Sequence, residues 1–316
     1  MRGLSQIILI SALIISSSFF VACTNTNTPE SEKISLNYLE DYVSDAAEYA
    51  KIVGDTEAFS AFTNLNGPFT TGDLYIYAYD FNGTLLAHPY QSEDIGTNRM
   101  DWTDAKGLPV IKVADYLARL GGGFIAYMYP APEGGAIDEA AIDTYVPKIG
   151  YVLPVDEGWW IGSGVYLSDL GDPNAEKVIS DMINLVERGA VFAQQNDENV
   201  AFKAISDPNG IFVDQEGHYL YAYGYNGTML AHAHMHDKIG TNLIDHTSAF
   251  GEKDILALSS TAKNGGGYVV FSWENPQNGN NKELKIGYVL PVDEDWWIGS
   301  GVYLSEITGN YEKIGV

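Results

Sequence analysis

Apolar and polar residues follow two different periods along this chain, and the same order of periods occurs twice. Between Leu39 and Val53, apolar residues recur at spacings of three and four, which predicts a long amphipathic helix. A second stretch with this spacing, from Val178 to Ala190, predicts another such helix. We expect Asn37 and Glu40 to form a capping pair at the start of the first helix.

Runs rich in Tyr, Ile, Val and Trp follow each predicted helix and are separated by turn signals. They predict five antiparallel strands in each half, joined by tight hairpins at 82–83 and 156–158. A shorter helix is expected at 108–120, ending at Gly121. A long helix followed by an antiparallel sheet with one inserted helix is an α+β plan, not a doubly wound one. In the first half the expected strands are 74–81, 84–89, 124–129, 148–155 and 159–167.

The pattern repeats because the sequence itself repeats. KIGYVLPVDEGWWIGSGVYLS, which begins at Lys148, returns with a single difference at Lys285, and YAYDFNGTLLAHP at Tyr77 returns as YAYGYNGTMLAHA at Tyr221. Each copy is far longer than the ~20 to 50 residues of solenoid repeats, so each is expected to have its own core. We predict two tandem domains and a short tail, at residues 35–170, 171–307 and 308–316.

The first 34 residues have a different character. Arg2 precedes an apolar run from Ile7 to Ala22, which is followed by Cys23 and a polar stretch, a layout typical of a secretory signal. We predict a lipoprotein signal peptide at residues 1–22, lipid attachment at Cys23 and a flexible tether at residues 23–34. An uncleaved membrane anchor is the alternative, because the run approaches the ~20 residues that span a bilayer. Either way, the domains are expected outside the cytoplasm, tethered to the cell membrane at the cell surface or in the periplasm.

Composition excludes several function classes. The 316 residues include 17 Lys plus Arg against 42 Asp plus Glu, a net charge of -25, so a phosphate backbone would be repelled and no nucleic-acid partner is expected. The chain has one cysteine, which rules out an intrachain disulfide, a cysteine-based zinc site and an iron–sulfur cluster. No phosphate loop, nucleophile elbow or acid–base pair stands out, so we expect neither a cofactor nor enzymatic activity.

The order of motifs in each copy resembles the single Cache domain family of extracytoplasmic sensor modules. The resemblance rests on a long helix, a YxYDxxGTxLAHP hairpin, an IGxN loop, a helix ending in GGG, an aromatic strand, KxGYV and WWIGSGVY, in that order. It implies two PAS-like domains, each with a long N-terminal helix packed on a five- to six-stranded antiparallel sheet. It also implies a pocket for a small molecule, often an organic acid or amino acid. Only a short tail follows Ser305, so we expect any signalling output to come from a partner in the membrane, a sensor or a transporter.

Lys148 and Lys285 are candidates for the charged partner of such a ligand. Each begins an otherwise apolar strand in a chain that has few lysines. An ammonium in this position pairs well with a carboxylate. A solvated lysine at a strand end is the alternative interpretation.

A tyrosine and a histidine lie on either side of the first predicted hairpin turn. A two-residue type I′ turn would pair Tyr77 with His88 and, by the same arithmetic, Tyr221 with His232. A three-residue turn with a glycine bulge would instead pair Ile76 with His88. One interpretation is that this pair faces a ligand. The other is that the histidine is a core residue bonded to a backbone carbonyl.

The two copies differ where a pocket is expected to differ. Arg99 corresponds to Leu243, so only the first copy offers a bidentate carboxylate donor there. A surface arginine that balances the acidic field is the alternative for Arg99. The difference favours distinct ligands in the two copies, or a single active site. Aromatic side chains are expected to form the walls of these sites, and the candidates are Trp102, Tyr129, Tyr151, Trp273 and Tyr288.

Three alternating histidines belong to the second copy alone. His232, His234 and His236 point to one side of an extended strand, and imidazoles suit Zn, Cu or Ni. Same-face positions on a strand are nearly 7 Å apart, about twice the ~3.3 Å rise per residue, so three in a row rarely converge on one metal. A metal site is therefore a minor alternative, and none is predicted.

Two function classes fit these observations. The favoured one is a lipid-anchored extracytoplasmic protein that binds or senses an organic acid or amino acid and presents it to a partner in the membrane. The alternative is a structural or adhesive surface lipoprotein whose Cache-like domains lack a functional pocket. Binding of small carboxylates to the purified chain would separate the two classes.

Overall fold

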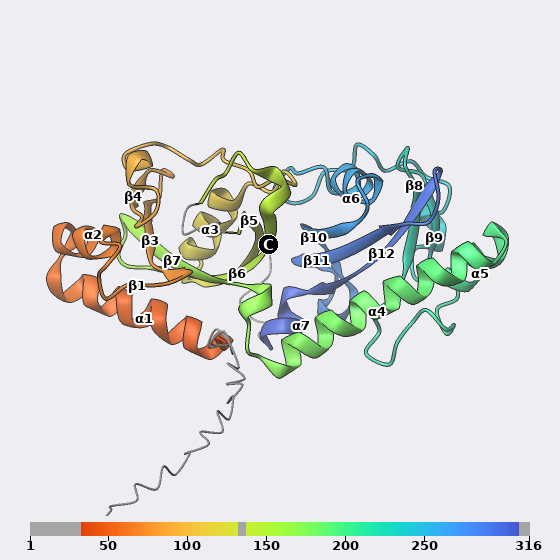
Figure 1. Ribbon diagram of the computed structural model, residues 1–316, viewed down its shortest axis with the longest axis horizontal. Coiled ribbons are helices and arrows are strands. Elements are labelled where there is room, and N and C mark those ends of the chain that lie inside the picture. Colours follow the sequence, from red (N-terminus) through yellow and green to blue (C-terminus); the bar gives the residue numbers. More distant parts are fainter. Residues whose placement is uncertain (1–32, 132–136, 310–316) are drawn as a thin grey trace, which may run out of the picture. The chain divides into compact units, whose positions relative to one another are not determined.

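A computed structural model describes residues 33–131 and 137–309 of the chain (Figure 1). The predicted signal peptide at 1–22, the lipidation site Cys23, most of the tether and most of the tail lie outside the described residues. Within the described residues, no helix has the length and apolar character needed to cross a membrane.

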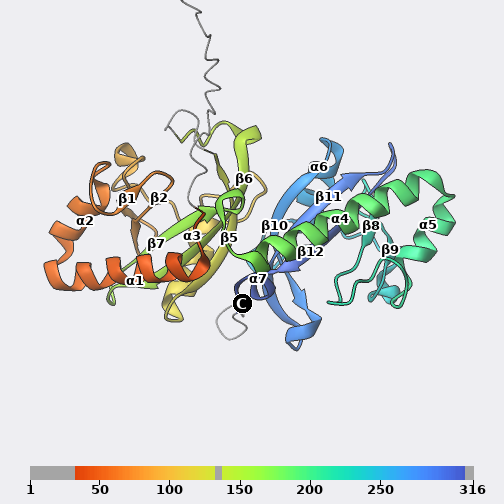
Figure 2. The same ribbon diagram turned by 60° about the horizontal axis from the view of Figure 1, so that its bottom comes forward.

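The first domain is an antiparallel sheet with helices on both faces (Figures 1 and 2). Its strand order is β4-β3-β7-β6-β5, so the last strand lies in the middle. The helix α1 packs against β6 and β7, whereas α3 packs against β5 and β6. The helices are α1 (Leu36–Val53), α2 (Asp55–Thr63) and α3 (Val110–Arg119), with short 3-10 turns η1 (Ser92–Asp94), η2 (Ile142–Thr144) and η3 (Leu167–Asp169). The strands are β1 (Thr70–Thr71), β2 (Leu74–Tyr75), β3 (Tyr77–Asp80), β4 (Leu85–Ala87), β5 (Gly123–Pro130), β6 (Tyr145–Pro154) and β7 (Trp159–Tyr166), of which β1 and β2 form a separate short hairpin.

The second domain repeats this plan. Its strand order β9-β8-β12-β11-β10 corresponds element by element to that of the first domain. The helix α4 packs against β11 and β12, and α6 packs against β10 and β11. The helices are α4 (Pro173–Gln195), α5 (Glu198–Ile205), α6 (Asp254–Lys263) and α7 (Leu304–Thr308), with 3-10 turns η4 (His236–Lys238) and η5 (Pro276–Asn278). The strands are β8 (Tyr221–Gly224), β9 (Met229–His232), β10 (Gly267–Asn275), β11 (Asn281–Pro291) and β12 (Trp296–Tyr303).

The predicted α+β architecture with two five-stranded antiparallel sheets is confirmed. The predicted capping pair is wrong. Ser35 is the N-cap of α1, because its backbone is extended and its hydroxyl accepts a hydrogen bond from the N–H of Tyr38 at 3.2 Å. Asn37 instead lies within the first turn of the helix, where a side chain cannot act as the N-cap.

The apolar stripe of α1 fixes the helix to the sheet. Leu39, Val43, Ala46 and Ala50 recur at spacings of three and four and are at most 1% exposed. Burial of a leucine or valine side chain contributes ~1.5 to 3 kcal/mol, and the alanines allow the helix to approach the strands closely. This packing leaves the opposite face of the sheet to α3 and to the candidate site.

The first hairpin combines both predicted registers. The pairing shifts at a bulge within β3, so the turn itself is of the bulged kind. Beyond the bulge, Ala78 pairs with Ala87, a register that continues to Tyr77 and His88, and the rings of these two residues stack with their centres 6.4 Å apart. In the second domain, Tyr221 pairs directly with His232. The predicted tyrosine–histidine pairing is confirmed in both domains.

Candidate functional site: a lysine in an aromatic cage

Lys148 lies at the centre of a cage of tyrosines. On β6 it pairs with Tyr127 of β5 and Tyr166 of β7, and cross-strand partners project from the same face of a sheet. The Nζ atom lies 4.5 Å from the ring centre of Tyr166, 4.7 Å from that of Tyr75 and 5.0 Å from that of Tyr129. Each such contact stabilises a cation by ~0.5 to 2 kcal/mol. Three aromatic faces therefore hold the ammonium in place.

The ammonium of Lys148 is buried without a hydrogen-bonding partner. The residue is 1% exposed, which excludes the solvated strand-end interpretation. It forms no hydrogen bond or ion pair with any described residue. Burial lowers the pKa of Lys148 from its usual 10.5 to about 7, against the opposing fields of Asp73 and Asp169. A buried cation without a counter-ion is unstable, and an anion placed beside it would remove that penalty.

Two glycines of β7 make room for the cage. A Cβ atom on Gly162 would lie 2.6 Å from the hydroxyl oxygen of Tyr77. A Cβ atom on Gly164 would lie 3.1 Å from the hydroxyl oxygen of Tyr127 and 3.2 Å from the Cε atom of Lys148. Larger residues would displace these side chains, because a close-packed interior has no spare volume. The Gly-Ser-Gly sequence of this strand is therefore explained by packing.

His88 is held in one neutral tautomer. Its Nδ1 atom accepts hydrogen bonds from the backbone N–H groups of Tyr90 and Gln91, both at 3.1 Å. Nδ1 therefore carries no proton, and the proton of the neutral ring must lie on Nε2. Burial, followed by the fields of Lys148 and Arg99, lowers the pKa of His88 to about 3. The core interpretation expected a backbone carbonyl as the partner of His88, whereas the observed partners are backbone N–H groups. The Nε2–H group forms no hydrogen bond with a described residue.

A small cavity lies against the cage. Its volume is about 30 Å³, and Tyr77, His88, Arg99, Trp102 and Tyr129, all predicted from the sequence, line it. Tyr75 and Tyr129 belong both to this lining and to the cage around Lys148. The volume admits only a water molecule or two, so an organic ligand enters only if the rings separate.

Arg99 already has a carboxylate partner. Its Nη2 donates to both carboxylate oxygens of Glu139 at 2.7 and 2.6 Å, and its Nη1 donates to Asp94 at 3.1 Å. The guanidinium lies 5.2 Å from the ring centre of Trp102, and the side-chain amide of Gln91 donates to Glu139 at 2.6 Å. Arg99 is 9% exposed, which excludes the surface-arginine alternative. The predicted bidentate site is thus filled by a carboxylate of the protein itself.

The second domain contains the corresponding cage. Lys285 is buried, and its Nζ atom lies 4.4 Å from the ring centre of Tyr303 and 5.0 Å from that of Tyr219. The Nδ1 atom of His232 accepts two backbone N–H groups at 3.1 Å, so its tautomer is fixed as in the first domain. Burial is again the main cause that lowers the pKa of this histidine to about 3.

The second pocket is smaller and less polar than the first. Its volume is about 20 Å³, and four predicted residues line it: Tyr221, His232, Trp273 and Lys285. Phe271 and Trp273 stand where the first domain has Tyr127 and Tyr129, and Leu243 stands in place of Arg99. This pocket therefore offers fewer hydroxyl donors and has no guanidinium.

Two predicted ligand residues lie on the opposite face of their sheets. The hydroxyl of Tyr151 donates to Glu40 of α1 at 2.9 Å, and Tyr288 packs against Tyr268 with ring centres 5.1 Å apart. Each is three positions beyond the lysine of its strand, and an odd separation reverses the face. The structure therefore does not bring Tyr151 or Tyr288 together with the other candidates.

The three alternating histidines do not converge. His232 uses Nδ1 for backbone amides, His236 bonds to the carbonyl oxygen of Ser206 through Nε2 at 2.7 Å, and His234 is exposed. Among the described residues, no group of three or more His, Cys, Asp or Glu side chains is placed to hold a metal ion.

Several site residues were not predicted from the sequence. Tyr75 and Tyr166 complete the cage, and Glu139 and Gln91 border the cavity. Tyr75 is two positions from Tyr77, so the period of a strand signals its face. Glu139 lies in a long connection, where no periodic pattern indicates a position.

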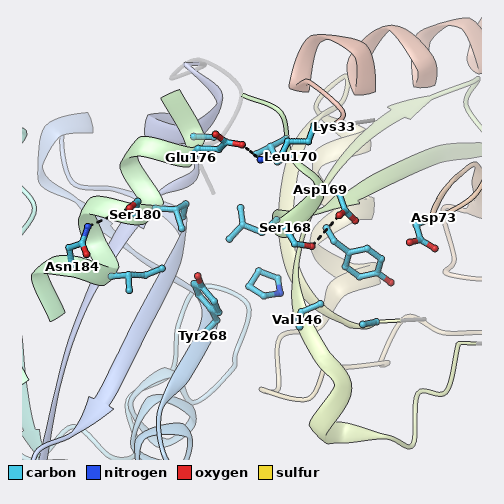
Figure 3. Close-up of a pocket in the computed structure, with 17 residues that line it drawn as sticks. Lys33, Asp73, Val146, Ser168, Asp169, Leu170, Glu176, Ser180, Asn184 and Tyr268 are labelled. Atoms are coloured by element: carbon cyan, nitrogen blue, oxygen red, sulfur yellow. Dashed lines mark hydrogen bonds and ion pairs between the residues drawn. The ribbon is translucent and has the colours of Figure 1, made fainter. Parts of the chain in front are cut away.

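A larger cavity adjoins the first cage from another side (Figure 3). Its volume is about 630 Å³, and Tyr166 belongs both to its lining and to the cage. Asp73 and Asp169 also line it, as labelled in Figure 3, together with apolar side chains such as Ile179 and Ile183 of α4. The carboxylates make this approach to Lys148 acidic.

Comparison with known families identifies the class of protein. The family model of Single Cache domain 2 matches residues 55–180 and again residues 174–315. The chain therefore belongs to this family and is a tandem single Cache sensor module.

Individual relatives match parts of the chain. The sensor histidine kinase MctS of Rhizobium johnstonii is 34% identical over 90 residues, which are 28% of this chain and 19% of the kinase. The match thus spans about a fifth of the length of that relative. A methyl-accepting chemotaxis protein of Vibrio parahaemolyticus is 23% identical with a TM-score of 0.37, over 42% of this chain and 95% of that one. A structure described as carboxylic acid recognition by a Cache chemosensory domain is 21% identical with a TM-score of 0.34, over 41% of this chain and 91% of that one.

Proposed function

We propose that this chain is a lipid-anchored extracytoplasmic protein that captures a small carboxylate, an organic acid or an amino acid, in its first Cache domain. It presents the occupied domain to a partner in the membrane, a sensor or a transporter. The role is one of binding and sensing, and no catalytic step is assigned to the chain. Membership of a sensor-domain family and the chemistry of the cage support this proposal.

The buried, unpaired ammonium of Lys148 is the observation that carries the proposal. Three tyrosine ring faces orient the Nζ atom of Lys148, but these faces provide no oxygen or nitrogen acceptor. The N–H donors of Lys148 are therefore free for an anion. The Nε2–H group of His88 adds a neutral donor beside the same rings, since Tyr75 lies 4.8 Å from His88 between ring centres. A cation and several donors without a matching acceptor fit a carboxylate.

A structural role without a ligand is the competing function, and one observation favours it. The first pocket measures only about 30 Å³, which is too small for an organic acid. Binding therefore requires the aromatic rings to move apart. Under the competing function the cage would be rigid and no carboxylate would change the stability of the protein.

Thermal unfolding of the full chain with a panel of organic acids and amino acids tests the proposal. A ligand present at a hundred times its Kd stabilises a protein by ~2.7 kcal/mol. We expect a stabilising carboxylate in the panel and loss of its effect in Lys148→Met, which keeps most of the side chain and removes the ammonium group. The matched control is Tyr151→Phe, on the opposite face of the same strand, which should respond as the wild type does. No stabilisation across the panel would favour the structural role.

A further inference from the structure

A second and larger cavity lies beside Lys285 in the second domain. Its volume is about 250 Å³, compared with about 20 Å³ for the aromatic pocket. Lys285 and Tyr219 line both spaces, and no other lining residue is shared. These two side chains therefore form the partition between a closed aromatic pocket and a cavity large enough for a small organic molecule.

Lys285 has no polar partner of its own. It is 3% exposed and forms no hydrogen bond or ion pair with any described residue. Its contacts are the ring faces of Tyr219 and Tyr303, and the hydroxyl of Tyr303 donates to a backbone carbonyl at 2.6 Å. The ammonium thus keeps its N–H donors for whatever occupies the cavity.

A charged histidine in the wall of this cavity bonds to two carboxylates, of which Glu306 also lines the cavity. The Nδ1 atom of His218 lies 2.7 Å from Asp214, and its Nε2 atom lies 3.0 Å from Glu306. Burial alone would lower the pKa of His218, but these two hydrogen bonds outweigh it and raise the pKa to about 9. The imidazolium and the two carboxylates, together with Lys285, sum to no net charge. Both carboxylates bond to His218, and neither forms an ion pair with Lys285.

The first domain differs at the corresponding positions. Asp73 stands where the second domain has Gly217, Asp169 stands in place of Glu306, and Leu74 stands in place of His218. The side of Lys148 that corresponds to this cavity therefore carries two carboxylates and no imidazolium. Asp73 and Asp169 are labelled in the cavity wall in Figure 3. An anion approaching from this side is repelled in the first domain and meets a neutral surrounding in the second.

We propose that the second domain binds a small hydrophilic carboxylate in the 250 Å³ cavity, with the carboxylate group on Lys285. This inference rests on the proposed function only in the class of its ligand. The exposed side chains of Gln277 and His234 lie at the rim, where they meet the polar part of the ligand. The chain then carries two carboxylate sites of different shape: an aromatic pocket that must open in the first domain, and a preformed polar cavity in the second.

Calorimetric titration of the full chain with glycolate, a compact hydroxy acid, tests this site. We expect binding to the wild type and its loss in Lys285→Met. We expect Gln277→Glu to weaken binding about fivefold, the effect of a like charge ~4 Å away in water. The matched control is Asn209→Asp, an equal charge change at an exposed position of the same domain, which should leave binding unchanged.

The variants also distinguish this inference from the proposed function. Loss of glycolate binding in Lys285→Met but not in Lys148→Met supports the second site, whatever the first domain binds. Loss only in Lys148→Met, or no binding to the wild type, overturns the second site. Loss in Lys285→Met without any effect of Gln277→Glu places the ligand in the aromatic pocket and also overturns it. Unfolding temperatures of each variant show that the fold is kept.

Discussion

The ammonium of Lys148 contacts the face of the Tyr166 ring, 4.5 Å from its centre, and not the hydroxyl of that tyrosine. The hydroxyl instead donates to the carbonyl oxygen of Pro130 at 2.7 Å. Lys285 and Tyr303 repeat this relationship at 4.4 Å in the second domain. The tyrosine positions the cation without using its N–H donors. Both domains therefore hold a buried cation in readiness for an anion.

The buried charge of Lys148 should destabilise the free protein in a pH-dependent way. Its folded pKa of about 7 lies below the usual 10.5, so the penalty is full below about pH 7 and is lost as the pH rises toward 10.5. Lys148→Met lacks this penalty. We expect the variant to exceed the wild type in free energy of unfolding by a few kcal/mol at about pH 6, and by much less at about pH 10. Urea unfolding across this range checks it, and a pH-independent difference would contradict the depressed pKa.

Carboxylate binding at the first cage should take up a proton above neutral pH. A carboxylate beside Nζ stabilises the ammonium and raises its pKa, whereas the free protein loses this proton near pH 7. The affinity should therefore fall with rising pH above about 7, by at most tenfold per unit. Calorimetry in buffers of different ionisation enthalpy measures the proton directly. Zero proton uptake at about pH 8 would show that the ligand does not contact Lys148.

His88→Asn separates the two roles of the histidine. The amide oxygen of asparagine can replace Nδ1 as acceptor for the backbone N–H groups of Tyr90 and Gln91, but nothing replaces Nε2–H. We expect a folded variant with about tenfold weaker carboxylate binding, as for loss of one hydrogen bond. Thermal unfolding and calorimetry measure the two effects, with His232→Asn as the matched control in the second domain. Unchanged affinity would make His88 a purely structural residue.

Glu139 should compete with a ligand for Arg99. Both of its oxygens accept hydrogen bonds from Nη2, so the guanidinium is neutralised within the pocket. Glu139→Gln removes the competing charge and should strengthen carboxylate binding several-fold, because Arg99 then attracts the ligand. Asp94→Asn, which alters the weaker partner at 3.1 Å, is the control and should have a smaller effect. Weaker binding in Glu139→Gln, measured by calorimetry, would mean that Glu139 holds the pocket in its binding form.

His218 should titrate well above an ordinary histidine. Hydrogen bonds to Asp214 and Glu306 raise its pKa to about 9 against the effect of burial. Its stabilising contribution is therefore fully present below about pH 6.5 and is lost as the pH rises through 9. An NMR titration of the imidazole signals measures this pKa, and His218→Gln identifies the signal. A midpoint at or below about 6.5 would contradict the charge balance of the second cavity.

Sequence periodicity was enough to predict the sheets and part of the site. The runs of Tyr, Val and Trp gave the strands, and the hairpin arithmetic brought Tyr77 to His88. Lys148 was identified because a cation at the start of an apolar strand is unusual. The alternation of faces along the strand would also have excluded Tyr151 from the predicted site. Tyr166 would have been included in it, because Tyr166 is the direct cross-strand partner of Lys148.

The remainder depends on contacts that no local pattern encodes. The pairing of Arg99 with Glu139 joins residues forty positions apart through a loop of irregular backbone. The tautomer of His88 depends on the path of the chain after β4, where two amides turn back to its ring. The charge of His218 depends on Glu306, which is distant in the sequence. Tertiary packing, not propensity, determines each of these.

The most direct test of carboxylate binding at Lys148 is calorimetric titration of the full chain at about pH 6 with organic acids and amino acids, in the wild type and in Lys148→Met. At this pH Lys148 is charged, and we expect a carboxylate to bind the wild type and to bind the variant at least a hundredfold more weakly, because a buried charge pair worth ~3 kcal/mol is removed. Equal affinity for wild type and variant, or no binding across the panel, would contradict it.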